Sequence, residues 1–443
     1  MGGFCVRRWH NCVGAANSAS CNGGGIYMSG NGLVSNAVVS LNDAVYAIPF
    51  GGGVYATAGI ITHSMIASNL TESSGNSYGG TGQTPSGGGV YLAGTAQLHN
   101  SIVFGNRAVH SYQYRMGETL GAGVFISASA KVYHSTIVGN YGGERGYGDG
   151  VYISGGELKN SIVSHNFSGF DSGDYTVNHY NVWQAGGTVS YNVLPRSHLI
   201  APGVGNVAAD PGFVNVYAGD LSLGPGSPAI DAATVIAGMD SDFSGVARPL
   251  NGSDAESALP DMGALEAQPL DAGPLRINFT VAQEDGFDSL SAALQAHVAG
   301  ESLGSLVYHW DFDGDGVADI TGSDKATVSH LFDTVGYHDI GLKVVSSGAG
   351  EATIVKRAAA RVHPSVLYLS DAGTSEAPYN TPDKASATLQ DIVNWADDNA
   401  EIRVAPGAYK ITTKPVTLRR GIKVVGTDNT TTAIERAPAS TTR

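Results

Sequence analysis

The sequence predicts an all-β protein whose first part is a right-handed parallel β-helix, a solenoid of short stacked strands. Three observations lead to this fold class: two short motifs recur five times each, the interval between them is nearly constant, and the composition is rich in glycine. The chain has 61 glycines in 443 residues, whereas charged residues make up only 14%. Such a composition favours tight turns over helices flanked by charges.

The first motif is Gly-x-Gly, then Val or Ile, then Tyr or Phe. Its copies are residues 23–27, 51–55, 87–91, 121–125 and 148–152. Each copy is followed by a second motif, in which an apolar residue leads into Asn or His, then Ser or Ala, and the last residue is Asn. The copies of this second motif are residues 34–42, 61–69, 98–106, 132–140 and 158–166. Self-similarity of this kind predicts a stack of equivalent coils.

The interval between the motifs indicates how each coil is built. In every copy the aromatic residue precedes the second motif by six or seven residues, which is room for two short strands and a tight bend. A small polar pair such as Asn100-Ser101 supplies the corner without a helix. We expect the terminal asparagines, from Asn42 to Asn166, to stack as a hydrogen-bonded ladder.

The stretch between the last Asn and the next Gly varies in length. These variable stretches are residues 43–50, 70–86, 107–120 and 141–147. All of them leave one corner of the solenoid, and in repeat proteins such a corner often marks the binding face. Aromatic rings beside polar groups suit sugar rings, so the predicted ligand-binding residues are Tyr78, Tyr112, Tyr114, Tyr141, Tyr147 and Arg115. The alternative is that these tyrosines only pack the loops onto the solenoid.

At these motifs, residues 23–205 resemble the pectin-lyase-like β-helix repeat proteins of bacterial surfaces. A further series of segments, 209–213, 226–231, 248–249 and 260–266, resembles the terminal segment of the choice-of-anchor β-helix proteins. The resemblance implies a surface protein with a covering segment at residues 206–269. Because this segment is rich in Pro, Gly and Asp, it is suited to covering the last coil, whose backbone edge would otherwise be open.

A change of composition after residue 269, where glycine becomes rarer and alternating apolar strands begin, predicts a new domain at residues 270–363. Segments 307–316, 328–332 and 336–344 resemble the polycystic-kidney-disease (PKD) domain. The resemblance implies a small immunoglobulin-like β-sandwich that acts as a spacer or an adhesive module on extracellular proteins. Several short strands without a helical period agree with this fold.

Four aspartates follow the predicted core residue Trp310: Asp311, Asp313, Asp315 and Asp319. Their spacing, with Gly314 and Gly316 between them, is similar to the start of a calcium loop. A true EF-hand is excluded, because the twelfth position, which requires Glu, is Gly322. The aspartates are therefore candidate calcium ligands, and the alternative is a plain turn between two strands.

Residues 364–443 begin with a strand at 367–370 and continue through a turn-rich stretch into a helix. Thr388, with Asp391 three residues later, is suited to cap this helix. One apolar face at helical spacing contains Leu389, Ile392, Val393 and Ala396. With the short strands expected at 402–409 and 421–426, the pattern resembles the N-terminal part of a second β-helix plugged by an amphipathic helix.

The predicted domains are thus a β-helix at 1–205, its covering segment at 206–269, a sandwich at 270–363 and a partial β-helix at 364–443. No apolar stretch is long enough for a transmembrane helix, and the N-terminus lacks the apolar region of a signal peptide. Since the rest of the chain is typical of secreted proteins, we expect an internal fragment of a longer extracellular or cell-surface protein, truncated at both ends.

Charge and cysteine content limit the possible partners. A net charge of −15 with only 24 lysines and arginines argues against nucleic acid as a partner, because nucleic-acid binders concentrate positive charge. The three cysteines, Cys5, Cys12 and Cys21, form no CxxC pair, so a zinc site has little support. One disulfide with a spare thiol and three free thiols are both open.

Many pectin-lyase-like folds cleave polysaccharides, so the residues must decide whether this chain is an enzyme. Hydrolysis needs two converging carboxylates, and β-elimination needs a base with a cation that stabilises the enolate. The nearest catalytic candidates are Glu118, Glu144, Arg145 and Asp149. We predict a non-catalytic extracellular protein that binds glycans or mediates adhesion through the variable corner. A polysaccharide lyase or glycoside hydrolase and a purely structural stalk are the alternatives.

Overall fold

The computed structural model describes residues 4–5, 8–10, 13–15, 17–19, 22–46, 49–73, 84–110, 118–143, 145–168, 180–253, 258–397, 399–411, 421–427 and 431–436. These residues belong to two compact units, Met1–Asn278 with Val298–Glu301 and Phe279–His297 with Ser302–Arg443. Among them, no helix has the length and apolar character that a membrane span requires.

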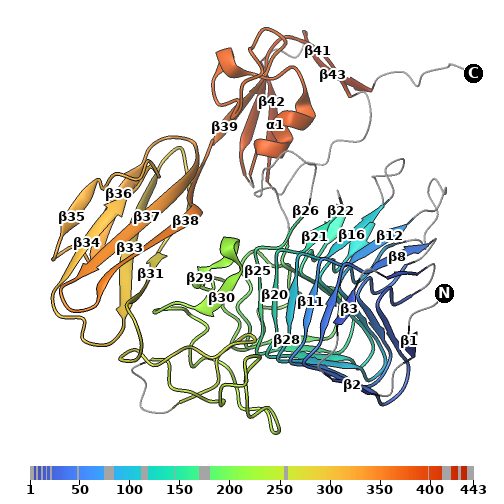
Figure 1. Cartoon of the computed structure of the whole chain (residues 1–443). Coiled ribbons are helices and arrows are strands. Elements are labelled where there is room, and N and C mark those ends of the chain that lie inside the picture. The colour runs from blue at the N-terminus through green and yellow to red at the C-terminus, as the bar shows by residue number, and fades with distance from the viewer. Residues whose placement is uncertain are drawn as a thin grey trace, which may run out of the picture. The chain divides into compact units, whose positions relative to one another are not determined.

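Four parallel sheets, which we name A to D, form the first unit, and successive coils of the chain add one strand to each in turn (Figure 1). Sheet A contains β1 (Phe4–Cys5), β5 (Ile26–Met28), β9 (Val54–Ala56), β13 (Val90–Leu92), β18 (Val124–Ile126), β23 (Val151–Ile153) and β27 (Val182–Gln184). Sheet B contains β2 (Arg8–His10), β6 (Leu33–Ser35), β10 (Ile60–Thr62), β14 (Gln97–His99), β19 (Lys131–Tyr133), β24 (Glu157–Lys159) and β28 (Thr188–Ser190). The predicted all-β fold with a parallel β-helix is confirmed.

Sheets C and D complete each coil. Sheet C contains β3 (Val13–Ala15), β7 (Val38–Ser40), β11 (Met65–Ala67), β15 (Ile102–Phe104), β20 (Thr136–Val138) and β25 (Ile162–Ser164). Sheet D contains β4 (Ser18–Ala19), β8 (Asp43–Tyr46), β12 (Leu70–Ser73), β16 (Arg107–His110), β21 (Tyr141–Gly142) and β26 (Phe167–Ser168). Because neighbouring strands are one coil apart, a residue type that repeats along the sequence stacks along the solenoid.

Apolar residues fill the inside of the stack because side chains alternate between the two faces of a strand. The middle residues of sheet B, such as Ile61, Leu98 and Val132, are fully buried in one continuous core. Between sheets B and C the chain turns at a residue with positive φ, for example His63 at 46° or Asn100 at 41°. Asn and His tolerate this left-handed conformation better than most residues, so the predicted polar corner is confirmed.

The asparagine ladder is also confirmed, and it runs inside the turn between sheets C and D. Asn69 Nδ2 donates to Asn106 Oδ1 at 2.9 Å, and Asn106 Nδ2 donates to Asn140 Oδ1 at the same distance. Equivalent bonds continue to Asn166 and from there to Asn181. Each buried amide therefore finds its partner in the next coil, which satisfies polar groups that would otherwise destabilise the core.

The variable stretches differ from the prediction, because each begins with a regular strand of sheet D. In β12, for example, Leu70 pairs with Asp43 on one side and with Arg107 on the other. Only the residues after these strands vary in length. Two more short strands, β17 (Glu118–Leu120) and β22 (Arg145–Tyr147), pair with each other just before the next coil begins.

The covering segment takes a different position from the one expected for it. It contains β29 (Phe213–Asn215), the 3-10 helix η2 (Val216–Ala218) and β30 (Asp220–Leu223), and it packs on the outer side of sheet C rather than only over the last coil. Phe213, Leu223 and Met262 share a buried cluster with Ile102 and Ile162 of that sheet. The apolar outward residues of sheet C explain this position, since they require a cover.

Two sheets form the first part of the second unit. One contains β31 (Arg276–Val281), β33 (Leu290–Ala299) and β36 (Thr327–Phe332), and the other contains β32 (Asp285–Phe287), β38 (Gly350–His363), β37 (Gly336–Ser346), β34 (Leu306–Asp311) and β35 (Ile320–Gly322). Trp310 is fully buried, with the Phe279 ring edge-on at 5.4 Å. Most of the pairs are antiparallel, as in a β-sandwich.

The last part of the second unit is a short parallel sheet with one helix. Strands β39 (Val366–Leu369), β40 (Glu401–Val404) and β42 (Lys423–Gly426) pair in parallel, as do β41 (Gly407–Ile411) and β43 (Thr432–Arg436). A 3-10 turn, η3 (Pro382–Lys384), precedes helix α1 (Leu389–Trp395), whose predicted apolar face is buried on this sheet. The capping prediction is wrong in one respect, because Thr388 lies at the N-cap but its side chain makes no capping bond.

Candidate functional site

A column of aromatic side chains follows the outer face of sheet A, where the first motif places Tyr or Phe in every coil. Tyr55 lies 5.2 Å from Tyr27 and 5.1 Å from Tyr91, and Tyr91 lies 4.5 Å from Phe125, with rings within 15° of parallel. Phe125 continues the stack to Tyr152 at 5.4 Å. Because each ring covers the face of the next, this ladder offers a ligand mainly edges and hydroxyls. Its first role is to stabilise the stack.

A second group of rings lies beside the last coils and is arranged differently. We call Tyr147, Tyr180, Trp183 and His198 the aromatic cluster. His198 stacks on Trp183 at 4.0 Å and 10°, whereas Tyr147 and Tyr180 meet the Trp183 ring edge-on at 4.7 and 5.5 Å. Tyr180 is 41% exposed, and the other three are half-buried. The crossed arrangement leaves ring surface and polar edges at the corner of the solenoid.

Strand pairing positions this cluster. Trp183 lies in β27, in register with Tyr152 of the previous coil, and an isolated parallel bridge aligns it with His198. The Asp149 amide donates to the Tyr180 carbonyl at 3.0 Å, which fixes the start of the last coil. Tyr147 comes from β22, at the end of a variable stretch. The aromatic cluster therefore lies where sheet D passes into sheet A, the corner that the variable stretches share.

The predicted ligand-binding residues lie in different places. Tyr147 belongs to the aromatic cluster, and Tyr141 lies in β21, edge-on to Phe167 at 5.4 Å and below Arg107 at 5.2 Å. Tyr78, Tyr112, Tyr114 and Arg115 lie outside the described residues. The sequence reasoning missed Tyr180, Trp183 and His198. The Val182-Trp183 pair, which repeats the Val-Tyr of the motif without its glycines, was the available signal.

Among the predicted catalytic residues, the described carboxylates lie in contrasting surroundings. Glu118 is exposed in β17, in register with Arg145 of β22. Asp149 is 1% exposed and lies inside the solenoid. Glu144 lies outside the described residues. A glycosidase needs two carboxyl groups that face one bond, and Glu118 and Asp149 do not share one solvent-facing surface.

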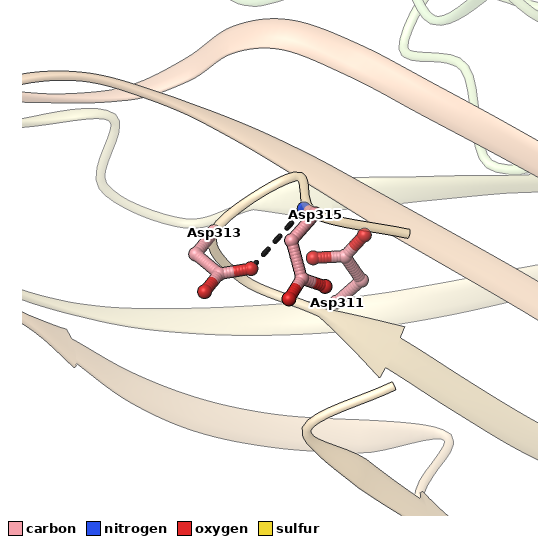
Figure 2. Close-up of side chains that lie close together, drawn as sticks. All are labelled: Asp311, Asp313 and Asp315. Atoms are coloured by element: carbon pink, nitrogen blue, oxygen red, sulfur yellow. Dashed lines mark hydrogen bonds between the residues drawn. The ribbon is translucent and has the colours of Figure 1, made fainter. Parts of the chain in front are cut away.

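The predicted metal ligands lie in the turn between β34 and β35. Figure 2 shows Asp311, Asp313 and Asp315 close together, and one carboxylate oxygen of each lies within 4.8 Å of the others. The same carboxylates hold the turn: Asp311 accepts the amides of Gly314 and Gly316 at 2.7 and 2.9 Å. Asp319 closes the loop from the other side by accepting the Phe312 amide at 2.7 Å. These bonds agree with the plain turn, and calcium binding stays a prediction.

A group of buried charged side chains lies between the covering segment and the B–C corner. We call Arg248, Glu266, Asp261 and His134 the buried clasp. Arg248 Nη1 lies 2.8 Å from Glu266 Oε1, with both side chains at most 1% exposed, and donates to the Asp261 carbonyl at 2.7 Å. It also contacts His134 Nδ1 at 2.7 Å. The Asp261 carboxylate accepts the amides of Asp231 and Ala267 at 2.7 and 2.6 Å.

Burial dominates the protonation of the clasp. Burial and the nearby Arg248 lower the pKa of His134 to about 3, so this imidazole stays neutral at ordinary pH. Burial raises the pKa of Asp261, as does the neighbouring Glu266 carboxyl. Every group has partners within the protein and no open surface, so the clasp fastens the covering segment. Its large pKa shifts have burial as their main cause.

Comparison with known proteins finds no family model that matches this chain, no similar curated protein and no similar solved structure. The site must therefore be interpreted from its own geometry.

Proposed function

We propose that this chain belongs to an extracellular or cell-surface protein that is not an enzyme and whose β-helix binds glycans at the aromatic cluster. The observation that carries the proposal is the crossed arrangement of Tyr147, Tyr180 and Trp183 at the variable corner. Aromatic rings with polar edges suit ligands that are apolar on one side and polar on the other. The ladder of sheet A, in contrast, covers its own ring faces.

Two observations favour binding over catalysis. Glu118 is exposed while Asp149 is buried, and the strongest pKa shifts belong to the buried clasp, which has no open surface. A polysaccharide lyase or glycoside hydrolase is the second candidate, because the backbone of Glu118 pairs in register with that of Arg145 at the same corner. A purely structural stalk is the third.

The resemblances described above also suggest the kind of protein to which the chain belongs. We infer that the covering segment is of the choice-of-anchor kind and that the sandwich is a PKD-like spacer or adhesive module of a bacterial surface protein. The buried clasp and the antiparallel sheets around Trp310 support this interpretation. They support it only as architecture.

A glycan array probed with the full chain, followed by a reducing-end release assay on each bound glycan, tests the proposal. We expect retention without release of reducing ends. The variant Tyr180→Ala should bind roughly tenfold more weakly, because removing one aromatic contact at a binding site costs on the order of 1–2 kcal/mol.

Tyr217→Ala is the matched control, since Tyr217 is even more exposed, at 57%, but lies in the covering segment. It should bind as the unchanged chain does. New reducing ends would instead support the enzyme. Absence of binding to every glycan would leave the stalk, and equal binding by Tyr180→Ala would move the site away from the aromatic cluster.

A further inference from the structure

Strand β38 leaves most of one backbone edge of the sandwich open. It pairs with β37 along one side, from Gly350 to Val362. On its other side the described residues pair with it only through β32, from Arg361 to His363. Residues 351–360 therefore form an edge of the five-stranded sheet. Such an edge presents backbone N–H and C=O groups with which a strand of another chain can pair.

The straight part of this edge is bounded at both ends. Gly350 begins it with a φ of 83°, and Ala358 ends it with a φ of 50°, in a bulge opposite Asp339. The Ala358 amide donates to Asp339 Oδ1 at 2.8 Å, which fixes the bulge. Because a bulge twists an edge away from further pairing, the segment suited to accept a strand is 351–357. Its midpoint is Ile354.

The outward face of this segment carries β-branched side chains between charges of opposite sign. Ile354 is 8% exposed and points into the sandwich, so the alternate residues point outward. These are Glu351, Thr353, Val355 and Arg357, and all four are exposed. Val355 is 52% exposed. Cross-strand pairs of β-branched residues and of opposite charges are the kinds that stabilise adjacent strands.

The order of these side chains is complementary to itself. When two antiparallel copies of the segment meet at a two-fold axis through Ile354, Thr353 lies opposite Val355 of the second copy. Glu351 then lies opposite Arg357 of the second copy, and each pair occurs twice. An axis one residue earlier or later leaves both charges opposite neutral side chains. An axis at 356 or 357 places two like charges opposite each other. Charge therefore selects the register that the boundaries of the segment also select.

We propose that the sandwich pairs with a second copy of itself through residues 351–357, so that the two five-stranded sheets become one continuous sheet. A two-fold contact of this kind is closed, so it produces a dimer and not a filament. A contact made by one short strand from each copy is small, so we expect the dimer to form only at high protein concentration. The inference goes beyond the proposed glycan binding and does not depend on it.

Sedimentation velocity of the full chain, at concentrations rising to about 1 mM, tests the proposal over the range of weak association. We expect a monomer at low concentration and a growing fraction of dimer as the concentration rises. Arg357→Glu places two carboxylates opposite each other at both ends of the paired segment. It should weaken dimerisation about tenfold, a change of about 1.4 kcal/mol. Glu351→Arg, which opposes two cations instead, should weaken it similarly.

Lys325→Glu is the matched control. It makes the same charge reversal in the turn between β35 and β36, away from the open edge, and should dimerise as the unchanged chain does. All three variants should keep the unfolding temperature of the unchanged chain nearly constant, since the substitutions lie outside the core. The Lys343–Glu351 ion pair lost in Glu351→Arg is exposed and contributes little.

An equimolar mixture of Arg357→Glu and Glu351→Arg supplies the deciding measurement. In the mixed dimer each end of the segment again has an acid opposite a base, so the mixture should dimerise about as strongly as the unchanged chain. A chain that stays monomeric at about 1 mM would overturn the proposal. So would a dimer that Arg357→Glu weakens no more than Lys325→Glu does, because its contact would lie elsewhere, or a mixture no stronger than its components.

Discussion

Sheets B and C are built by the same coils, yet their outer faces have opposite environments. Outside sheet C the covering segment buries Ile102, Val138 and Ile162, and at the B–C corner it encloses Arg248 with its carboxylate partner. Outside sheet B, Lys131 is exposed, and Glu157 and Lys159 are half-buried. The same repeated backbone therefore places charged side chains in two environments, buried under the covering segment outside sheet C and at the surface outside sheet B.

The difference shows how a charged residue in this solenoid should be interpreted. Strong pKa shifts are commonly used to locate functional sites, but here the strongest ones belong to a structural contact, because burial causes them. Exposure and partners are more informative here than the size of the shift.

The largest effect is expected from breaking the clasp. Arg248→Met leaves the Glu266 carboxylate buried without its cation, which typically costs about 3–5 kcal/mol. The Gly263 and Ala264 amides donate to Asn160 and Thr136 of the solenoid at 2.9 Å. Native-state hydrogen exchange at these two amides should therefore lose protection by that amount.

The control for this prediction is an exposed ion pair in the second unit. Lys343 and Glu351 lie 2.8 Å apart, with side chains 41% and 63% exposed. Lys343→Met should cost less than about 1 kcal/mol, because exposed pairs contribute little. If Arg248→Met is as mild as Lys343→Met, the clasp does not fasten the covering segment.

The sequence predicted the features that depend on the conformational preferences of residues in tight turns. The polar corner at His63 and the ladder through Asn106 follow from residue types that recur at fixed spacing, so each coil confirms the others. The sequence did not predict the contact between Arg248 and His134, which are 114 residues apart. Nothing in a single sequence pairs them, and only the apolar outward residues of sheet C indicate that this face needs a cover.

The candidate site also contains residues that the sequence predicted and residues that it did not. Tyr147 was predicted from its place in a variable stretch, whereas Trp183 lies in a coil that has lost the motif glycines.

The second prediction concerns the pH dependence of folding stability that the buried clasp causes. His134 has a pKa of about 3 in the folded protein against about 6.5 when unfolded. As pH falls below about 6.5, only the unfolded state takes up this proton, so folding stability decreases by up to about 1.4 kcal/mol per pH unit. Asp261 acts in the opposite direction, because its raised pKa favours the protonated folded state as pH falls.

The variant His134→Asn isolates the histidine share of this pH dependence. Asn occupies the equivalent corner at Asn100 and Asn160 with φ of 41° and 53°, against 41° at His134. Urea unfolding between pH 7 and 4 should show a shallower loss of stability for the variant than for the unchanged chain. Parallel curves would mean that His134 is not buried in a neutral state by the clasp.

The smallest effect is expected on the open side, in the ladder of sheet A. Tyr91 stacks on Tyr55 and on Phe125 and also contacts Phe50 at 4.7 Å. Tyr91→Leu keeps an apolar side chain but removes these aromatic pairs, so it should cost about 1 kcal/mol, given about 0.5–1.5 kcal/mol per pair beyond the buried area and partial compensation by leucine. Tyr27→Leu, which loses only the Tyr55 stack among the described residues, should cost less in the same urea titration. If the two variants are equivalent, the rings of the open face contribute as separate apolar side chains, and stacking between coils does not stabilise the solenoid.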